Sequence, residues 1–99
     1  TEAISSNLSE VRLALDCQEK LSIEYLSIGG ESTSRTIQPL VLYFWGKTWI
    51  LGAWCEMRRG FRSFRVDRMD LIINIGEKFE HTDEVSLQSY VGYQMDNEW

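Results

Sequence analysis

Five arginines occur within eleven residues of the chain, in the segment RRGFRSFRVDR at positions 58–68. If this segment is a β-strand, Arg62 and Arg68 lie on one face and Arg65 on the other, because side chains alternate along a strand. A guanidinium group presents a planar fork of donors that matches phosphate and carboxylate oxygens. Arginines beside aromatic rings also commonly hold the phosphates and bases of nucleic acids. The segment therefore predicts an anion-binding surface.

The same alternation assigns Phe64 and Val66 to the core, with arginines at both ends of this apolar pair. A purely structural role for some of the arginines stays open. Asp67 lies inside the segment and Asp70 follows it, so Arg65 and Arg68 could pair with these carboxylates and connect strands. The spacing favours neither role over the other.

Nucleophilic or metal chemistry has little support in the sequence. The single histidine, His81, lies in the acidic stretch EKFEHTDE, where no serine or cysteine constellation surrounds it. Cys17 and Cys55 are far apart and lack the spacing of a metal or redox motif. We therefore expect a protein that is not an enzyme and that uses no metal or other cofactor.

Charge is distributed unevenly along the chain. The net charge is −4 over residues 1–31, +5 over residues 32–68 and −6 over residues 69–99, which together give the overall −5. The basic middle supports the anion-binding interpretation. The longest apolar run, LVLYFW, is far too short to span a membrane, so we expect a cytoplasmic protein without a membrane partner.

The hydrophobic pattern predicts one helix followed by strands. An N-terminal helix is indicated by apolar residues with helical spacing, at Ile4, Leu8, Val11 and Leu15. Asn7 followed by Glu10 resembles a capping box. From Leu21 the pattern alternates, and five short strands separated by turns follow up to Gly76.

Within the second strand, Pro39 predicts an edge, a bulge or a break, because proline cannot donate to a ladder. A helix and five short strands in so short a chain indicate a mainly β fold (α+β by element count), an antiparallel barrel capped by the helix. We place this domain at residues 4–79 and expect residues 80–99 to be a tail or linker, with a short helix as the alternative.

Four elements of this sequence together resemble the WYL domain of bacterial transcriptional regulators. They are Tyr25 in LSIEYLS, the segment RTIQP (35–39), the segment TWILGAW (48–54) and the segment RSFRVDR (62–68). The three residues that name the family fall on Trp49, Ile50 and Leu51, with isoleucine in place of the tyrosine. The resemblance implies an Sm-like or SH3-like five-stranded barrel preceded by a helix.

The resemblance also implies a role and a site. WYL domains typically follow an N-terminal helix-turn-helix DNA-binding domain and are regarded as ligand sensors, with single-stranded nucleic acid or nucleotide-like effectors as favoured ligands. The implied basic pocket comprises Arg62 and Arg65, with Tyr25, Ser27 and Arg35 nearby and Arg68 in a more structural role.

A structural or dimerisation module stays open as the alternative function. In that case an exposed aromatic surface around Trp45 or Trp54 would be buried against a partner, for example in a homodimer.

Overall fold

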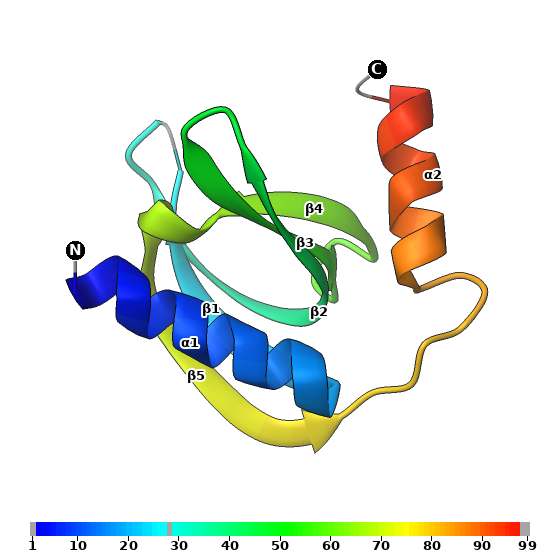
Figure 1. The fold of residues 1–99 in the computed structure, drawn as a ribbon, viewed down its shortest axis with the longest axis horizontal. Coiled ribbons are helices and arrows are strands. Elements are labelled where there is room, and N and C mark those ends of the chain that lie inside the picture. The colour runs from blue at the N-terminus through cyan, green and yellow to red at the C-terminus, as the bar shows by residue number, and fades with distance from the viewer. Residues whose placement is uncertain (1, 28, 98–99) are drawn as a thin grey trace.

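The computed structural model describes residues 2–27 and 29–97. The elements follow one another as a helix, five strands and a second helix (Figure 1). Their bounds are α1 (Glu2–Cys17), β1 (Glu19–Leu26), β2 (Ser32–Trp45), β3 (Thr48–Cys55), β4 (Gly60–Arg65), the 3₁₀ turn η1 (Val66–Arg68), β5 (Met69–Lys78) and α2 (Leu87–Asn97). The predicted fold class, mainly β with an N-terminal helix, is confirmed.

All strand pairs are antiparallel, and the strand order is β4-β3-β2-β1-β5. β4 and β5 are therefore the two edges of a strongly curved sheet (Figure 1). The predicted barrel is not closed. The reason lies in η1, which follows β4 directly and redirects the chain so that β5 forms its ladder with β1.

The proline in the second strand lies at a bulge. β2 is the central strand, and its pairing with β3 shifts register between Pro39 and Val41. Leu40 is left without a partner in β3 at this bulge, directly after Pro39, which pairs with Ala53. Proline is found at bulges because it cannot donate to a regular ladder. Of the three predicted roles, edge, bulge and break, the bulge is therefore confirmed.

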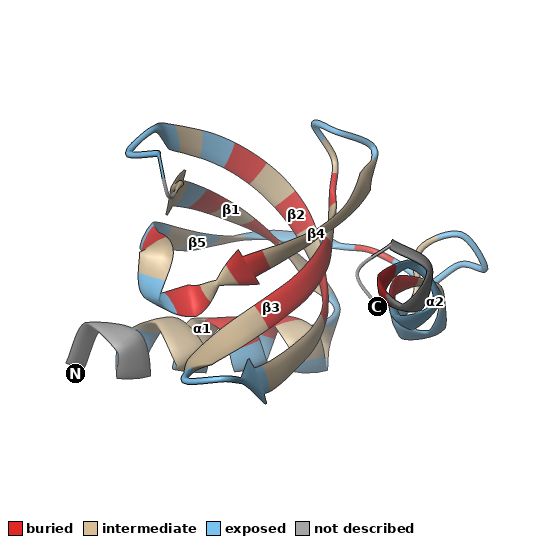
Figure 2. Cartoon of the chain, turned by 90° about the horizontal axis from the view of Figure 1, so that it is seen from above, coloured by how far each residue is buried: buried red, intermediate tan, exposed pale blue. Residues whose placement is uncertain are grey.

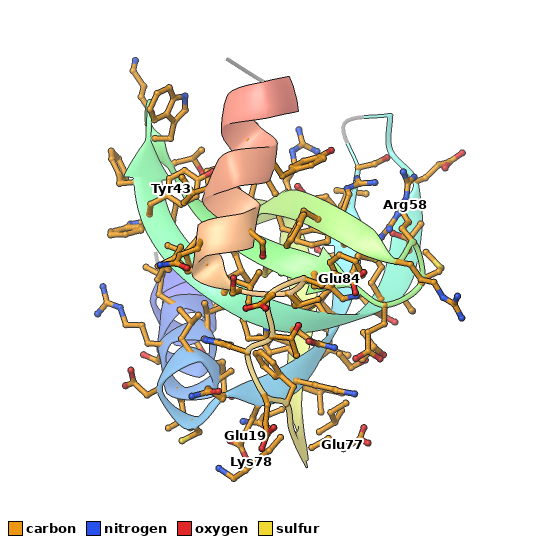
Figure 3. All side chains as sticks on the ribbon, turned by 90° about the vertical axis from the view of Figure 1, so that its right-hand side faces the viewer. Glu19, Tyr43, Arg58, Glu77, Lys78 and Glu84 are labelled. Atoms are coloured by element: carbon orange, nitrogen blue, oxygen red, sulfur yellow. The ribbon has the colours of Figure 1, made fainter. Side chains whose placement is uncertain are left out.

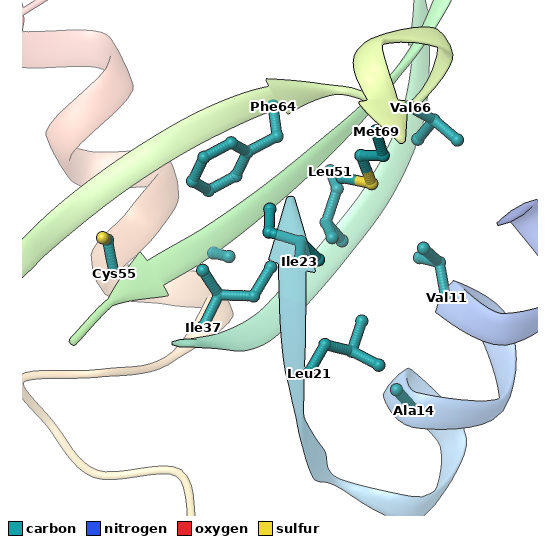
Figure 4. Packing of buried hydrophobic residues seen from close by; sticks show 11 residues of the cluster. Val11, Ala14, Leu21, Ile23, Ile37, Leu51, Cys55, Phe64, Val66 and Met69 are labelled. Carbon is teal, nitrogen blue, oxygen red and sulfur yellow. The ribbon is translucent and has the colours of Figure 1, made fainter. Parts of the chain in front are cut away.

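The main core fills the concave face of the sheet between β1, β3 and β4, and α1 closes one end of it (Figures 2 and 4). Phe64 and Val66 are fully buried, as predicted. From α1, Val11 and Ala14 reach the core, as Figure 4 shows. Cys55 lies at the end of this core away from α1 (Figure 4).

The predicted capping box at Asn7 is wrong, because α1 begins five residues earlier, at Glu2. Asn7 lies inside the helix and its Nδ2 donates to the carbonyl of Met69 at 3.1 Å, so it connects α1 to β5. The backbone of Ile4 lies in α1, but the predicted burial of its side chain falls outside what the structure describes. None of the described helices is long and apolar enough to cross a membrane.

The C-terminal segment contains a helix, α2, that packs on the convex face of the sheet (Figure 2). Tyr90 of α2 is 2 % exposed and forms a second apolar cluster with Leu40 and Phe79. Its hydroxyl lies 2.6 Å from the Ser63 hydroxyl and 2.9 Å from the Tyr43 hydroxyl. Burial raises the pKa of the Tyr90 phenol to well above its usual value, so it stays protonated.

Lys20 of β1, Gln38 of β2 and Glu56, which directly follows β3, interact on the surface of the sheet. Glu56 accepts from Lys20 Nζ at 2.8 Å and from Gln38 Nε2 at 3.0 Å. Burial alone would raise the pKa of the Glu56 carboxyl, but the hydrogen bonds from Lys20 and Gln38 and the charge of Lys20 outweigh it, and the pKa is lowered.

This lowered pKa predicts a small acid dependence of stability. A carboxyl with a lowered folded pKa contributes stability that is complete above its unfolded pKa, about 4.3, and is lost as the pH falls through the folded value. Between about pH 5 and pH 3 the free energy of unfolding is expected to fall less in Glu56→Gln than in the native protein. The difference between the two falls should be less than about 1 kcal/mol. Urea unfolding at both pH values measures this difference, and equal losses would contradict the prediction.

Candidate anion-binding site

Arg62 is the central cation of the candidate site. It lies on β4 next to the core, and its guanidinium carbon is 5.9 Å from the centre of the Phe64 ring. Burial lowers the pKa of Arg62, and the like charges of Arg58 and Arg35 lower it further. Arginine nevertheless stays charged near neutral pH. The side chain is therefore a partly buried cation in a positive local potential.

Arg35 is the most deeply placed of these arginines, at 9 % exposure. Its Nε donates to Thr33 Oγ1 at 3.2 Å and its Nη1 lies 3.5 Å from Cys55 Sγ. Arg35 and Cys55 lie on the concave face, because Ile37, two residues from Arg35, pairs directly with Cys55. These neutral partners fix the orientation of the guanidinium and leave its charge uncompensated.

Arg58 belongs to the same group, although the sequence placed it only in a turn. It is exposed in the β3–β4 turn, close enough to Arg62 to lower its pKa. In Figure 3, Arg58 and Tyr43 lie on opposite sides of α2. Among the side chains that the structure describes, those of residues 6–27 and 29–94, the ion pairs are Lys20 with Glu56 and Arg65 with Asp67. Arg35, Arg58 and Arg62, here called the arginine triad, thus have no carboxylate partner in the described chain.

Arg65 differs from the triad because it has a carboxylate partner. Its Nε and Nη2 donate to the two oxygens of Asp67 at 3.1 and 2.7 Å. The carboxylate of Asp67 neutralises the charge of Arg65. In turn, the hydrogen bonds from Arg65 lower the pKa of Asp67. Thr48 also donates to Asp67, at 3.2 Å. The pairing of Arg65 with Asp67, which the sequence left open, is therefore present in the structure.

Arg68 and Ser27 hold the β1–β2 turn. Arg68 Nη1 donates to the carbonyl of Ser27 at 3.1 Å and lies 3.5 Å from that of Leu26. The Ser27 hydroxyl accepts from the N–H of Glu31 at 3.2 Å. Pairing of Arg68 with Asp67 or Asp70 was the alternative from the sequence, and it is wrong for Arg68, because its guanidinium donates to backbone carbonyls instead. Arg68 Nε is buried and has no hydrogen-bond partner among the described residues.

Tyr25 connects the two groups of arginines. Its ring meets that of Phe64 edge to face with centroids 5.1 Å apart, and its hydroxyl accepts from the backbone N–H of Arg65 at 3.0 Å. The six residues that the sequence singled out thus separate into a triad-side group, Tyr25, Arg35 and Arg62, and a group engaged elsewhere, Ser27, Arg65 and Arg68. The sequence analysis did not include Arg58 in the site, because the sequence of a turn does not show which side chains a turn residue will approach.

The triad is suited to bind an anion. Three guanidinium groups on β2, β4 and the β3–β4 turn offer many donors around one region. The neighbouring rings of Tyr25 and Phe64 are apolar and would exclude water from one side of a ligand. Because the like charges repel one another, an anion placed between them would relieve that repulsion.

Comparisons with known proteins agree with this architecture. The WYL domain family model matches residues 6–72. The HTH-type transcriptional regulator YobV of Bacillus subtilis is 29 % identical over 83 residues, which cover 84 % of this chain and 26 % of that protein. Among solved structures, proteasome accessory factor B/C (PafBC) of Arthrobacter aurescens superposes with a TM-score of 0.73 at 28 % identity, covering 78 % of this chain and 12 % of PafBC.

This chain therefore spans about a quarter of the length of the curated relative, a transcriptional regulator. The family model covers the helix α1 from residue 6, all of β1 to β4, and the beginning of β5. It includes every residue of the arginine triad. On this match the chain belongs to the WYL domain family.

Proposed function

We propose that this chain is the effector-sensing domain of a bacterial transcriptional regulator, and that its ligand is a single-stranded nucleic acid or a nucleotide-like anion held by Arg35, Arg58 and Arg62. The observation that carries the proposal is the arginine triad, three neighbouring cations with no carboxylate partner among the described residues. In the parent protein, a helix-turn-helix domain would bind DNA, as the name of the curated relative suggests. We expect the regulator to act in the cytoplasm.

Under this proposal the domain regulates its parent protein by binding a ligand and catalyses no reaction. A ligand that binds one arrangement of the regulator more tightly than another shifts the population toward that arrangement. The strand β4 carries Arg62 on its concave face and Ser63 on its convex face, where Ser63 meets Tyr90 of α2. Ligand contact at Arg62 is thus one residue away from the docking site of α2, which leads toward the C-terminal end of the chain.

The first experiment compares Arg62→Gln with Arg65→Gln, two changes that remove the positive charge and keep a polar side chain, three residues apart on β4. Binding of fluorescently labelled single-stranded DNA and RNA oligomers is measured by anisotropy at several salt concentrations. Arg62→Gln is expected to weaken binding about 10- to 100-fold, because a hydrogen bond to a charged group contributes about 1.5–3 kcal/mol. Arg65→Gln is expected to weaken it less than about threefold, because Asp67 already neutralises Arg65.

The salt dependence provides the second readout. Each phosphate that the protein neutralises contributes about −0.7 to the slope of log affinity against log salt for a single strand. Arg62→Gln should reduce the slope by about one such step, and Arg65→Gln should leave it unchanged. Equal losses in both variants would contradict the assignment to the triad. If the native domain binds no oligomer even at low salt, nucleic acid is the wrong ligand, and nucleotides and other anions are tested next.

A further inference from the structure

The edge strand β5 presents an unusual apolar surface. Its residues Leu71, Ile73 and Ile75 are 45 %, 47 % and 37 % exposed. They alternate along the strand and therefore lie on one face, while Ile72 packs against the core from the other. Exposed aliphatic residues scattered singly are ordinary, but three in a row on one strand form a patch.

The backbone of β5 is also open to a further strand. β5 is an edge and pairs only with β1. At its two ends, the carbonyl of Met69 accepts from Asn7 and the N–H of Gly76 donates to the Asn74 side chain. Among the described residues, no side chain hydrogen-bonds to the backbone between these ends. Edge strands in natural proteins are usually short, charged or covered, and this stretch is none of these.

The stretch Leu71–Gly76, LIINIG, contains no charged residue, whereas Asp70 precedes it and Glu77 and Lys78 follow it. Apolar residues with charged residues on both sides limit pairing to a short central segment. An isologous pairing uses the same segment on both partners and closes on itself. The other edge, β4, is covered on its convex face by α2 through Phe61 and Tyr90.

We propose that β5 pairs antiparallel with β5 of a second copy of this chain about a two-fold axis at Ile73. This register sets Ile73 opposite Ile73 of the second copy and Leu71 opposite Ile75 of the second copy. All three exposed aliphatic residues then have an apolar cross-strand neighbour, the contact that stabilises sheets. Shifting this register by two residues in one direction would set Leu71 opposite the charged Glu77 of the second copy. Shifting it in the other direction would set Ile75 opposite Met69, which is buried.

The pairing forms a weak and salt-dependent dimer. A strand pair of this length buries less surface than the roughly 1,200–2,000 Å² of stable interfaces, so association is expected in the micromolar range or weaker. Each copy carries a net charge of −5, and the two copies repel one another. Salt screens this repulsion, so dimerisation strengthens with salt, whereas nucleic-acid binding at the triad weakens. The two associations are thereby distinguishable.

The first test measures molar mass by sedimentation equilibrium between about 1 µM and 1 mM protein. The native chain is expected to shift from monomer toward dimer, and more strongly at high salt. Ile73→Lys places two like charges directly opposite each other and should raise the dissociation constant at least about tenfold. Leu13→Lys, at a 52 % exposed leucine on α1, is the matched control and should leave it unchanged.

The second test locates the axis by disulfide formation in a Cys17→Ser background. Ile73→Cys should cross-link to the same residue of the second copy, because opposed residues of antiparallel strands have Cα atoms about 4.5–5.5 Å apart, within disulfide range. Ile75→Cys should not, because its copies lie about four residues apart along the strands, roughly 13 Å. Circular dichroism confirms that each variant is folded.

Three results would overturn the proposal. They are a native chain that stays monomeric at every concentration, a dimer that persists undiminished in Ile73→Lys, and cross-linking of Ile75→Cys that is as fast as that of Ile73→Cys. The first would show that β5 does not pair with a second copy, and the other two would place the dimer interface elsewhere.

Discussion

Phe64→Ala is expected to lower the free energy of unfolding by about 3–5 kcal/mol, the usual cost of removing a buried aromatic ring. Phe64 is 0 % exposed and belongs to the main core, which it enters from β4 (Figure 4). Its ring also meets the edge of Tyr25 at 5.1 Å and lies below the Arg62 guanidinium. A domain of this size has a total stability of about 5–10 kcal/mol, so the variant is expected to be partly unfolded at 37 °C.

Urea unfolding followed by tryptophan fluorescence measures this change. Phe44→Ala is the matched control, because Phe44 is 55 % exposed and its replacement should cost well under half as much. If Phe64→Ala still binds ligand under conditions where it is folded, its affinity should fall as well, since the ring supports Arg62. Similar losses of stability in the two variants would contradict the burial of Phe64 in the core.

Gly52→Ala is expected to displace α2 from the sheet. Gly52 is buried in β3, and a β-carbon at this position would lie 2.5 Å from the ring of Tyr90, far inside van der Waals contact. Either the ring of Tyr90 moves away or the strand distorts, and overpacking of this kind costs about 1–3 kcal/mol. Movement of the ring also breaks the contacts of its hydroxyl with Tyr43, Ser63 and Gln94.

Hydrogen exchange resolved by residue measures the displacement. The amides of α2 are expected to lose about 10- to 100-fold of their protection in Gly52→Ala, while the amides of β1 and β2 keep theirs. Gly92→Ala is the matched control on α2 itself, because a β-carbon there meets nothing within 4 Å and alanine favours the helix by about 1 kcal/mol. Gly92→Ala should therefore increase protection. Unchanged protection in Gly52→Ala would mean that α2 is not held by Tyr90.

The alternation of apolar and polar residues was a sound guide to the core. Phe64 and Val66 were assigned to the core from their position in the strand pattern alone, and both are fully buried. The tryptophans needed the structure, because each is compatible with either face. Trp45 is 57 % exposed at the end of β2, whereas Trp49 packs against the core.

The start of the helix and the closure of the barrel were predicted less well. Asn7 has the residue type and spacing of a helix cap, but in the structure its side chain binds the carbonyl of Met69, 62 residues away. A capping pattern is defined only by residues that are neighbours in sequence, so it cannot predict a hydrogen bond to a distant residue such as Met69. Closure of the barrel likewise depends on whether β4 and β5 meet, and η1 sets the direction of the chain between them.

The sequence by itself determined the order of the elements, the apolar core and the presence of a basic segment, because hydrophobic period and residue type are local properties of the chain. Only the tertiary structure decided which arginines are uncompensated. Arg65 is neutralised by Asp67 and Arg68 is held by backbone carbonyls, whereas Arg35, Arg58 and Arg62 have no carboxylate partner among the side chains that the structure describes. The physical reason is that the potential at a guanidinium depends on the charges within a few ångströms of it, and for the triad these are set by the curvature and register of the sheet.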